Sequence, residues 1–155
     1  MGQLYISFPE EAYIHYRRAS ELGDLESTFL VGYMNEYGEG TGVNIKKAVE
    51  YYQMAAAGGH RGAAHNLGYL YYMGNGVPKD LRTAYDFFNY AAHKGKADSM
   101  RNLGVMYENG DYVQRDYEQA LKWYRKAFEF GYMAAKADID RCQREMKRRG
   151  IRRKK

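Results

Sequence analysis

The chain has 155 residues but only one cysteine, two prolines and no long apolar run. The single cysteine, Cys142, excludes an internal disulfide, so the sequence does not require an oxidising compartment. No segment approaches the ~20 apolar residues of a membrane-spanning helix, and the first residues lack the basic region and cleavage site of a signal peptide. We therefore expect a cytoplasmic protein without a membrane span. The sequence leaves open whether the chain is part of a longer protein.

Motifs that carry catalytic or metal-binding chemistry are also missing. The sequence contains neither a G-x-S-x-G elbow nor a phosphate-binding P-loop. Gly38, Gly40 and Gly42 follow a predicted helix instead of a strand, and matching turns recur later, so we interpret them as a linker. The histidines lack the spacing of paired zinc ligands; they are His15, His60, His65 and His93. The sequence therefore predicts no catalytic residue, no metal and no cofactor.

What the sequence does contain is a repeat of 36 residues. Glycines recur at this spacing, and so do alanines and an aromatic pair; the glycines are Gly32, Gly68 and Gly104, the alanines Ala48, Ala84 and Ala120. A fixed period in the thirties is typical of a solenoid, in which each unit buries its apolar face against its neighbours. Solenoids offer long binding surfaces, so a binding role is the first expectation.

Each unit has the pattern of two helices joined by a glycine-rich turn. In the second unit, apolar residues at helical spacing predict a first helix that ends at Gly74, and a second helix runs over about 81–93 with Asp80 as its N-cap. Asn44 and Asp116 are the corresponding caps in the other units. The third unit has only one glycine in its loop, so we expect that loop to differ. We also expect Gly68 to lie where two helix backbones approach closely.

The repeat divides the chain into one solenoid, residues 1–149, and a short tail. A half-unit at 9–25 precedes three full units at 27–62, 63–98 and 99–134, and a capping helix at 135–149 follows. Apolar residues gather at the beginning: Leu4, Tyr5, Ile6, Phe8, Tyr13 and Ile14. We expect residues 1–8 to fold back over the first helix of a monomer, and a homodimer through this end is the alternative.

Positive charge is concentrated at the other end. Residues 141–155 contain nine Lys/Arg and one acidic residue, whereas the rest of the chain has 15 Lys/Arg and 18 Asp/Glu. The predicted tail at 150–155 and the end of the capping helix supply most of the cations: Arg148, Arg149, Arg152, Arg153, Lys154 and Lys155. Such a segment can make weak, salt-dependent contacts with nucleic acid or an anionic membrane.

The repeated residues closely resemble the Sel1-like repeat (SLR), a relative of the tetratricopeptide repeat. In the second unit the matching positions are Leu67, Gly68, Tyr71, Gly74, Gly76, Asp80, Ala84, Phe87, Phe88, Ala91, Ala92 and Gly95. The resemblance implies an all-α fold, a right-handed α/α superhelix whose first helices line the concave side. It also implies an adaptor or scaffold that binds proteins. One cysteine-rich branch has been linked to β-lactams, but this chain lacks the cysteines of that branch.

Four tyrosines stand outside the repeat pattern: Tyr33, Tyr37, Tyr69 and Tyr72. Helical geometry places Tyr33 and Tyr69 on the side of the first helices that faces away from the second helices, and Tyr37 and Tyr72 about one turn further along. Exposed aromatic residues are favoured at interfaces. We therefore predict a non-enzymatic module that holds a peptide or protein segment against them. Polar residues nearby are expected to bind its backbone or acidic groups: His65, Asn66, Arg101 and Asn102. For the two asparagines, hydrogen bonds within the repeat are the alternative role.

Three functions thus remain in competition. Protein binding in the groove comes first, and binding of an anionic polymer by the basic tail comes second. A hydrolase acting on β-lactams comes third, and the sequence offers little support for it.

Overall fold

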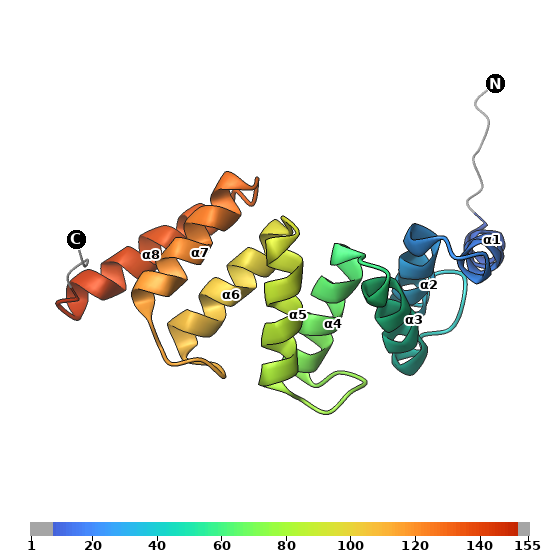
Figure 1. Ribbon diagram of the computed structural model, residues 1–155, viewed down its shortest axis with the longest axis horizontal. Helices are drawn as coiled ribbons and strands as arrows, with labels where there is room; N and C mark the ends of the chain where they lie inside the picture. Colours follow the sequence, from blue (N-terminus) through green and yellow to red (C-terminus); the bar gives the residue numbers. More distant parts are fainter. Residues whose placement is uncertain (1–7, 152–155) are drawn as a thin grey trace, which may run out of the picture.

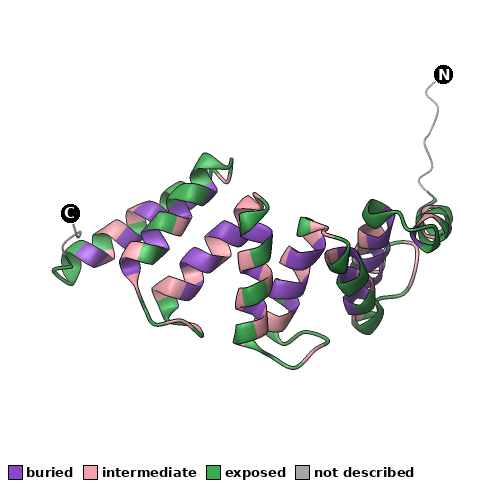
Figure 2. Ribbon diagram, viewed as in Figure 1, coloured by how far each residue is buried: buried purple, intermediate pink, exposed green. Residues whose placement is uncertain are grey.

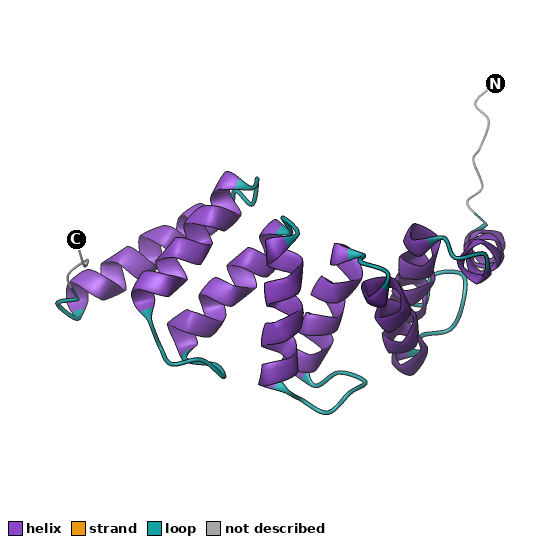
Figure 3. Cartoon of the chain, in the orientation of Figure 1, coloured by secondary structure: helices purple, strands orange, loops and turns teal. Residues whose placement is uncertain are grey.

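Eight α-helices make up the computed structural model, which describes residues 8–151, and no strand occurs in that range (Figure 3). The helices are α1 (Pro9–Glu21), α2 (Leu25–Tyr37), α3 (Ile45–Ala57), α4 (Arg61–Met73), α5 (Leu81–His93), α6 (Ala97–Asn109), α7 (Tyr117–Glu129) and α8 (Ala135–Arg148). They lie side by side in chain order, with α1 at one end of an elongated molecule and α8 at the other (Figure 1). Each helix packs mainly against its neighbours in sequence. The predicted α/α solenoid of helix-turn-helix repeats is confirmed.

The residues predicted to begin the second helices do cap them. The side chains of Asn44, Asp80 and Asp116 accept hydrogen bonds from the backbone N–H three residues later, at 3.0, 3.1 and 3.0 Å. Each bond satisfies one of the N–H groups that a helix start leaves without a partner. The first helices end at Gly38, Gly74 and Gly110, all in the left-handed conformation. The 36-residue period therefore reappears as three equivalent pairs: α2 with α3, α4 with α5, and α6 with α7.

The prediction that the third loop would differ is wrong. Tyr112 stands 36 residues after Gly76 and adopts the same left-handed backbone, with a φ of 63° against 71° for the glycine. A tyrosine in this region is strained, since its Cβ crowds the backbone. The ring of Tyr112 packs against that of Tyr85, with centroids 5.6 Å apart. The loop thus keeps its course because the helices at its two ends are placed as in the other units.

The repeated glycines leave room for aromatic rings of the second helices. A Cβ atom on Gly68 would lie 2.7 Å from the ring of Phe88, which fills the space above this glycine. Gly32 and Gly104 are covered in the same way by Tyr52 and Tyr124. An aromatic ring of the second helix therefore rests on a glycine of the first helix in every unit, and at Gly32 the backbone oxygen of Ala48 also lies 3.4 Å from the Cβ position.

The core follows the interfaces between successive helices (Figure 2). Ala48, Ala84 and Ala120 are fully buried, as expected for small residues at helix contacts. Of the tyrosines at repeat positions, only Tyr52 and Tyr124 are fully buried. The others are half-buried: Tyr51, Tyr71 and Tyr107.

The two ends of the solenoid are described only in part. Pro9 begins α1, and its carbonyl group lies against Gly40 of the α2–α3 loop, where a side chain would not fit. The predicted cover formed by residues 1–8 lies outside the described residues except for Phe8, which is exposed. At the other end, Arg152, Arg153, Lys154 and Lys155 also lie outside them. None of the described helices has the length and apolar character needed to cross a membrane.

Candidate functional site

The second unit differs from the other two in one contact between its first and second helices. In the first unit, the Tyr52 hydroxyl of α3 donates a hydrogen bond of 2.6 Å to Glu36 of α2. In the third unit, Tyr124 donates in the same way to Glu108. The corresponding residues of the second unit are Phe88, which has no hydroxyl group, and Tyr72, which replaces the glutamate. The two changes compensate each other, because a phenylalanine needs no acceptor.

A recess of about 140 Å³ lies at this changed contact. Its walls come from three helices: Tyr69 and Tyr72 of α4, Phe88 of α5, and Arg101, Asn102 and Val105 of α6. The Tyr72 ring packs on that of Phe88, with centroids 6.4 Å apart, and its hydroxyl donates a 2.7 Å hydrogen bond to Asp111. Tyr72 is thereby fixed as a wall of the recess, while Tyr69 remains half exposed at its edge.

This recess opens on what we call the first-helix face, the surface of α2, α4, α6 and α8 that faces away from α3, α5 and α7. The predicted tyrosines follow one another across it. The rings of Tyr33 and Tyr37 lie 4.5 Å apart. Partial burial raises the pKa of Tyr37, and the nearby Glu36, Tyr33 and Tyr69 raise it further. Tyr69 is thus near enough to influence Tyr37 electrostatically, and it also lines the recess between α4 and α6.

Two of the predicted polar residues interact within the chain. His65 is half-buried between α4 and α6, where its Nδ1 lies 2.8 Å from the Ser99 hydroxyl. Burial lowers the pKa of His65 to about 4, so the ring is neutral at pH 7. Asn66 interacts with the Tyr52 hydroxyl, in keeping with a role inside its own repeat. Neither residue extends freely over the first-helix face.

Arg101 is also engaged, in a network of charged residues that joins α6 to α8. It donates two hydrogen bonds to Asp138, at 2.7 and 3.3 Å, and Arg141 donates a third, at 2.7 Å. Arg141 continues to Glu108, at 2.7 Å. Burial alone would raise the pKa of Asp138, but the hydrogen bonds from the two arginines outweigh burial and hold this pKa below its ordinary value. The face of Arg101 that lines the recess is therefore held in a fixed position.

Of the eight predicted groove residues, the recess brings four together: Tyr69, Tyr72, Arg101 and Asn102. The side chain of Asn102 makes no hydrogen bond within the range 8–151, so its amide group is available to a ligand. The sequence analysis missed Asp138 and Glu108, each of which has an arginine partner more than 30 residues away in the chain.

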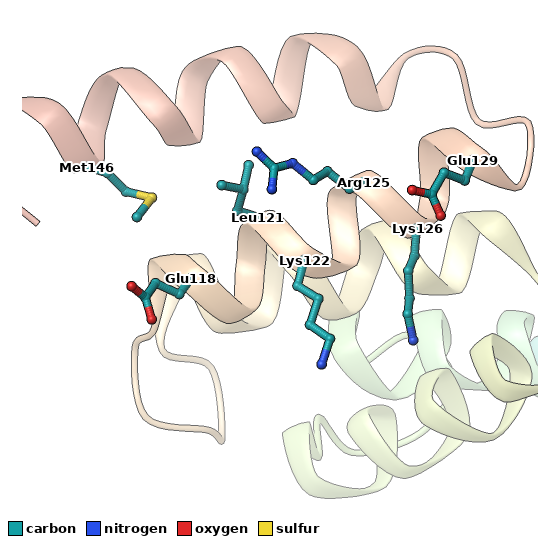
Figure 4. A pocket seen from close by; sticks show the side chains of 7 residues that line it. All are labelled: Glu118, Leu121, Lys122, Arg125, Lys126, Glu129 and Met146. Carbon is teal, nitrogen blue, oxygen red and sulfur yellow. The ribbon is translucent and has the colours of Figure 1, made fainter. Parts of the chain in front are cut away.

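Elsewhere the described residues show little sign of reactive chemistry. Cys142 is fully buried, and burial raises the pKa of its thiol to about 11. No group of histidine, cysteine and acidic residues within 8–151 is placed to hold a metal ion. A wider depression between α7 and α8 has lysine and glutamate side chains around a floor of Leu121 and Met146 (Figure 4). The charges there are mixed, and Lys122 and Lys126 point away from α8 (Figure 4).

Comparison with known families finds one match. The Sel1 repeat matches residues 9–24, 25–60, 62–96 and 97–138. A search of curated proteins found no match.

Several solved structures are similar. The Sel1 repeat protein from Oxalobacter formigenes has a TM-score of 0.81 and 27% identity, over 84% of this chain and 54% of that protein. The protein c5321, a protective antigen of uropathogenic Escherichia coli strains that displays an SLR fold, has a TM-score of 0.75 and 37% identity, over 77% of this chain and 26% of that protein. The cysteine-rich protein B of Helicobacter pylori has a TM-score of 0.66 and 26% identity, over 88% of this chain and 98% of that protein. The chain thus matches about half of the first protein and a quarter of the second.

Proposed function

The chain belongs to the Sel1 repeat family, and from this we propose that it is a non-enzymatic interaction module that binds a peptide or protein segment on its first-helix face. The single observation that carries this proposal is the recess at Phe88. It occurs where the second unit exchanges the glutamate–tyrosine pair of its neighbours for Tyr72 and Phe88. A change in an otherwise repeated contact leaves an aromatic recess on a surface that solenoids use for binding.

The size and lining of the recess favour one side chain of a larger ligand. Pockets for small molecules usually measure ~300–1,000 Å³, whereas this one measures about 140 Å³. Its walls are the aromatic rings of Tyr69, Tyr72 and Phe88 together with Val105. An apolar or aromatic side chain would bury its surface there, which is the usual contribution of an anchor residue at a protein interface.

Polar groups at the edge of the recess suit the backbone of a bound segment. Asn102 offers both a donor and an acceptor, the pair of groups that an extended peptide presents. Tyr69, Tyr37 and Tyr33 lie to one side and would give further aromatic contact along the segment. Arg101 would form part of the recess wall and would not bind the ligand through its guanidinium group, because that group already binds Asp138.

Binding of an anionic polymer by the basic tail has less support. Four of its six cations lie outside the described residues, and the other two, Arg148 and Arg149, both bind Glu145. A cytoplasmic location and a monomeric state remain predictions.

Replacement of Tyr69 by alanine tests the proposed function. A peptide selected from a displayed library against the wild-type chain would serve as ligand. We expect Tyr69→Ala to weaken its binding more than tenfold, because a half-exposed aromatic anchor is lost while the core is left intact. Titration calorimetry measures the affinity, and circular dichroism verifies the helix content.

Tyr90→Ala is the matched control, because Tyr90 is also exposed but belongs to α5, outside the recess. We expect it to change the affinity less than twofold. Equal affinity of Tyr69→Ala and wild type would contradict binding at the recess.

A further inference from the structure

A second depression, of about 440 Å³, lies where the C-terminal half of α8 passes the end of α6 and the start of α7. We call it the arginine pocket, after the five arginines in its lining: Arg115, Arg141, Arg144, Arg148 and Arg149. The acidic residues of the pocket are Glu108 and Glu145. Positive charge therefore exceeds negative charge in a surface region of a chain whose first 140 residues are mildly acidic. Such a local excess attracts anions.

Both glutamates of the arginine pocket are already paired. Glu108 accepts hydrogen bonds from Arg141, at 2.7 and 3.1 Å. Glu145 accepts from Arg148 at 2.7 Å and from Arg149. The hydrogen bonds from these two arginines lower the pKa of Glu145 to about 2, so it stays ionised and its partners stay bound near neutral pH. Three of the five arginines thus form hydrogen bonds to carboxylates.

The other two arginines have no carboxylate partner within residues 8–151. Arg115, in the loop between α6 and α7, donates one hydrogen bond of 3.2 Å to the Asn109 carbonyl group. The side chain of Arg144, on α8, makes no hydrogen bond or ion pair there. The two guanidinium groups come from different elements and line the same pocket. The pocket therefore presents two unpaired, planar groups of donors to a ligand.

We propose that the arginine pocket binds a phosphate monoester, such as a phosphorylated side chain of a peptide. A carboxylate has two oxygens, and a single guanidinium group in bidentate geometry occupies both. A phosphate monoester offers three terminal oxygens and close to two negative charges at neutral pH, so it matches two separate arginines. The volume exceeds that of a bare ion and leaves room for the atoms to which the phosphate is attached.

A nucleic acid fits the pocket less well. Binding of single strands relies on exposed aromatic rings that stack on bases, but Tyr117, the aromatic residue of the pocket, is buried and the Arg149 guanidinium covers its ring at 5.3 Å. The proposal does not depend on the recess at Phe88, because the two sites share no residue.

Calorimetric titration of the full chain with O-phospho-L-serine, inorganic phosphate and L-glutamate tests the proposal. The titrations are run at pH 7.5 and constant ionic strength, where phosphate is mostly dianionic. We expect saturable binding of phosphoserine, binding of inorganic phosphate within tenfold of it, and binding of glutamate at least tenfold weaker. The double variant Arg115→Gln/Arg144→Gln should lower the phosphoserine affinity at least tenfold and keep the wild-type melting temperature, since both side chains are exposed.

Arg82→Gln is the matched control, because Arg82 is exposed on α5 outside the pocket, and its affinity should stay within twofold of wild type. Five results would overturn the proposal, four of them from comparisons between ligands or variants. They are an absence of saturable phosphoserine binding, glutamate binding as tight as phosphoserine, inorganic phosphate binding more than tenfold tighter, equal losses in the double variant and the control, and an affinity unchanged in the double variant.

Discussion

Gly68→Leu is expected to lower the free energy of unfolding by about 3 kcal/mol, near the upper end of the usual cost of overpacking. The reason is the ring of Phe88, which lies only 2.7 Å from the place of the first side-chain atom. Both helices are held by further contacts, so the strain cannot be relieved by a small shift of one side chain. Thermal and denaturant unfolding monitored by circular dichroism measure the change.

Gly42→Leu provides the comparison for this substitution. No heavy atom lies within 4 Å of a Cβ at Gly42, and its φ is not positive. We expect this loop variant to stay within about 0.5 kcal/mol of wild type, as surface changes usually do. Equal stability of Gly68→Leu and wild type would show that Phe88 does not rest on this glycine.

Asp138→Asn is expected to lower the free energy of unfolding by about 2 kcal/mol, the range for hydrogen bonds to charged groups. The variant keeps the shape of the side chain but removes the charge that holds Arg101 and Arg141 between α6 and α8. Asp138 is almost fully buried, whereas its arginine partners are partly exposed. Water can therefore replace some of the lost contacts, which keeps the cost below that of a fully buried pair.

The effect of Asp138→Asn should depend on pH. Because the folded-state pKa of Asp138 is lowered, its contribution is present above the unfolded pKa of about 3.9 and is lost as the pH falls through the folded pKa. The difference between wild type and variant should be complete at pH 7 and shrink below about pH 4.

Asp140→Asn is the control for the ion-pair network. Asp140 lies on the same helix and pairs only with Lys136, at 3.0 Å and in an exposed position. We expect a change below about 0.5 kcal/mol at every pH. A loss in Asp140→Asn as large as that in Asp138→Asn would show that the charge of α8 matters and the network does not.

Most of the fold could be predicted from the sequence because its signals are local. Asp80 predicts the start of a helix and Gly74 predicts the end of one, and both predictions depend only on a few adjacent residues. The 36-residue period repeats these signals in all three units. Tyr112 shows where this reasoning fails. A tyrosine in place of a glycine suggests a different loop, but the helices on both sides impose on Tyr112 the same left-handed backbone that Gly76 adopts in the second unit.

The candidate site could be predicted only in part. The helical positions of Tyr69 and Asn102 placed them on the first-helix face, where both line the recess. The helical position of His65 suggested the same, yet its contact with Ser99 depends on how closely α4 and α6 approach. The bond between Arg101 and Asp138 spans 37 residues and leaves no local pattern.

The recess can be altered by giving the second unit a pair of residues that another unit of the same chain already contains. Tyr72→Glu/Phe88→Tyr would restore in the second unit the pair that Glu36 and Tyr52 already form in the first. The new glutamate would accept a hydrogen bond from the new tyrosine and would place polar atoms where the recess is now apolar. The hydrogen bond from Tyr72 to Asp111 would be lost, at a surface loop.

The affinity of this double variant for a peptide selected against the wild-type chain is the most direct measure of the proposed function. If an anchor side chain enters the recess at Phe88, the double variant should stay folded, with a melting temperature within about 5 °C of wild type, and should bind the peptide more than tenfold more weakly. A folded double variant that binds the peptide as tightly as wild type would contradict the proposal that this face binds its partner through the recess.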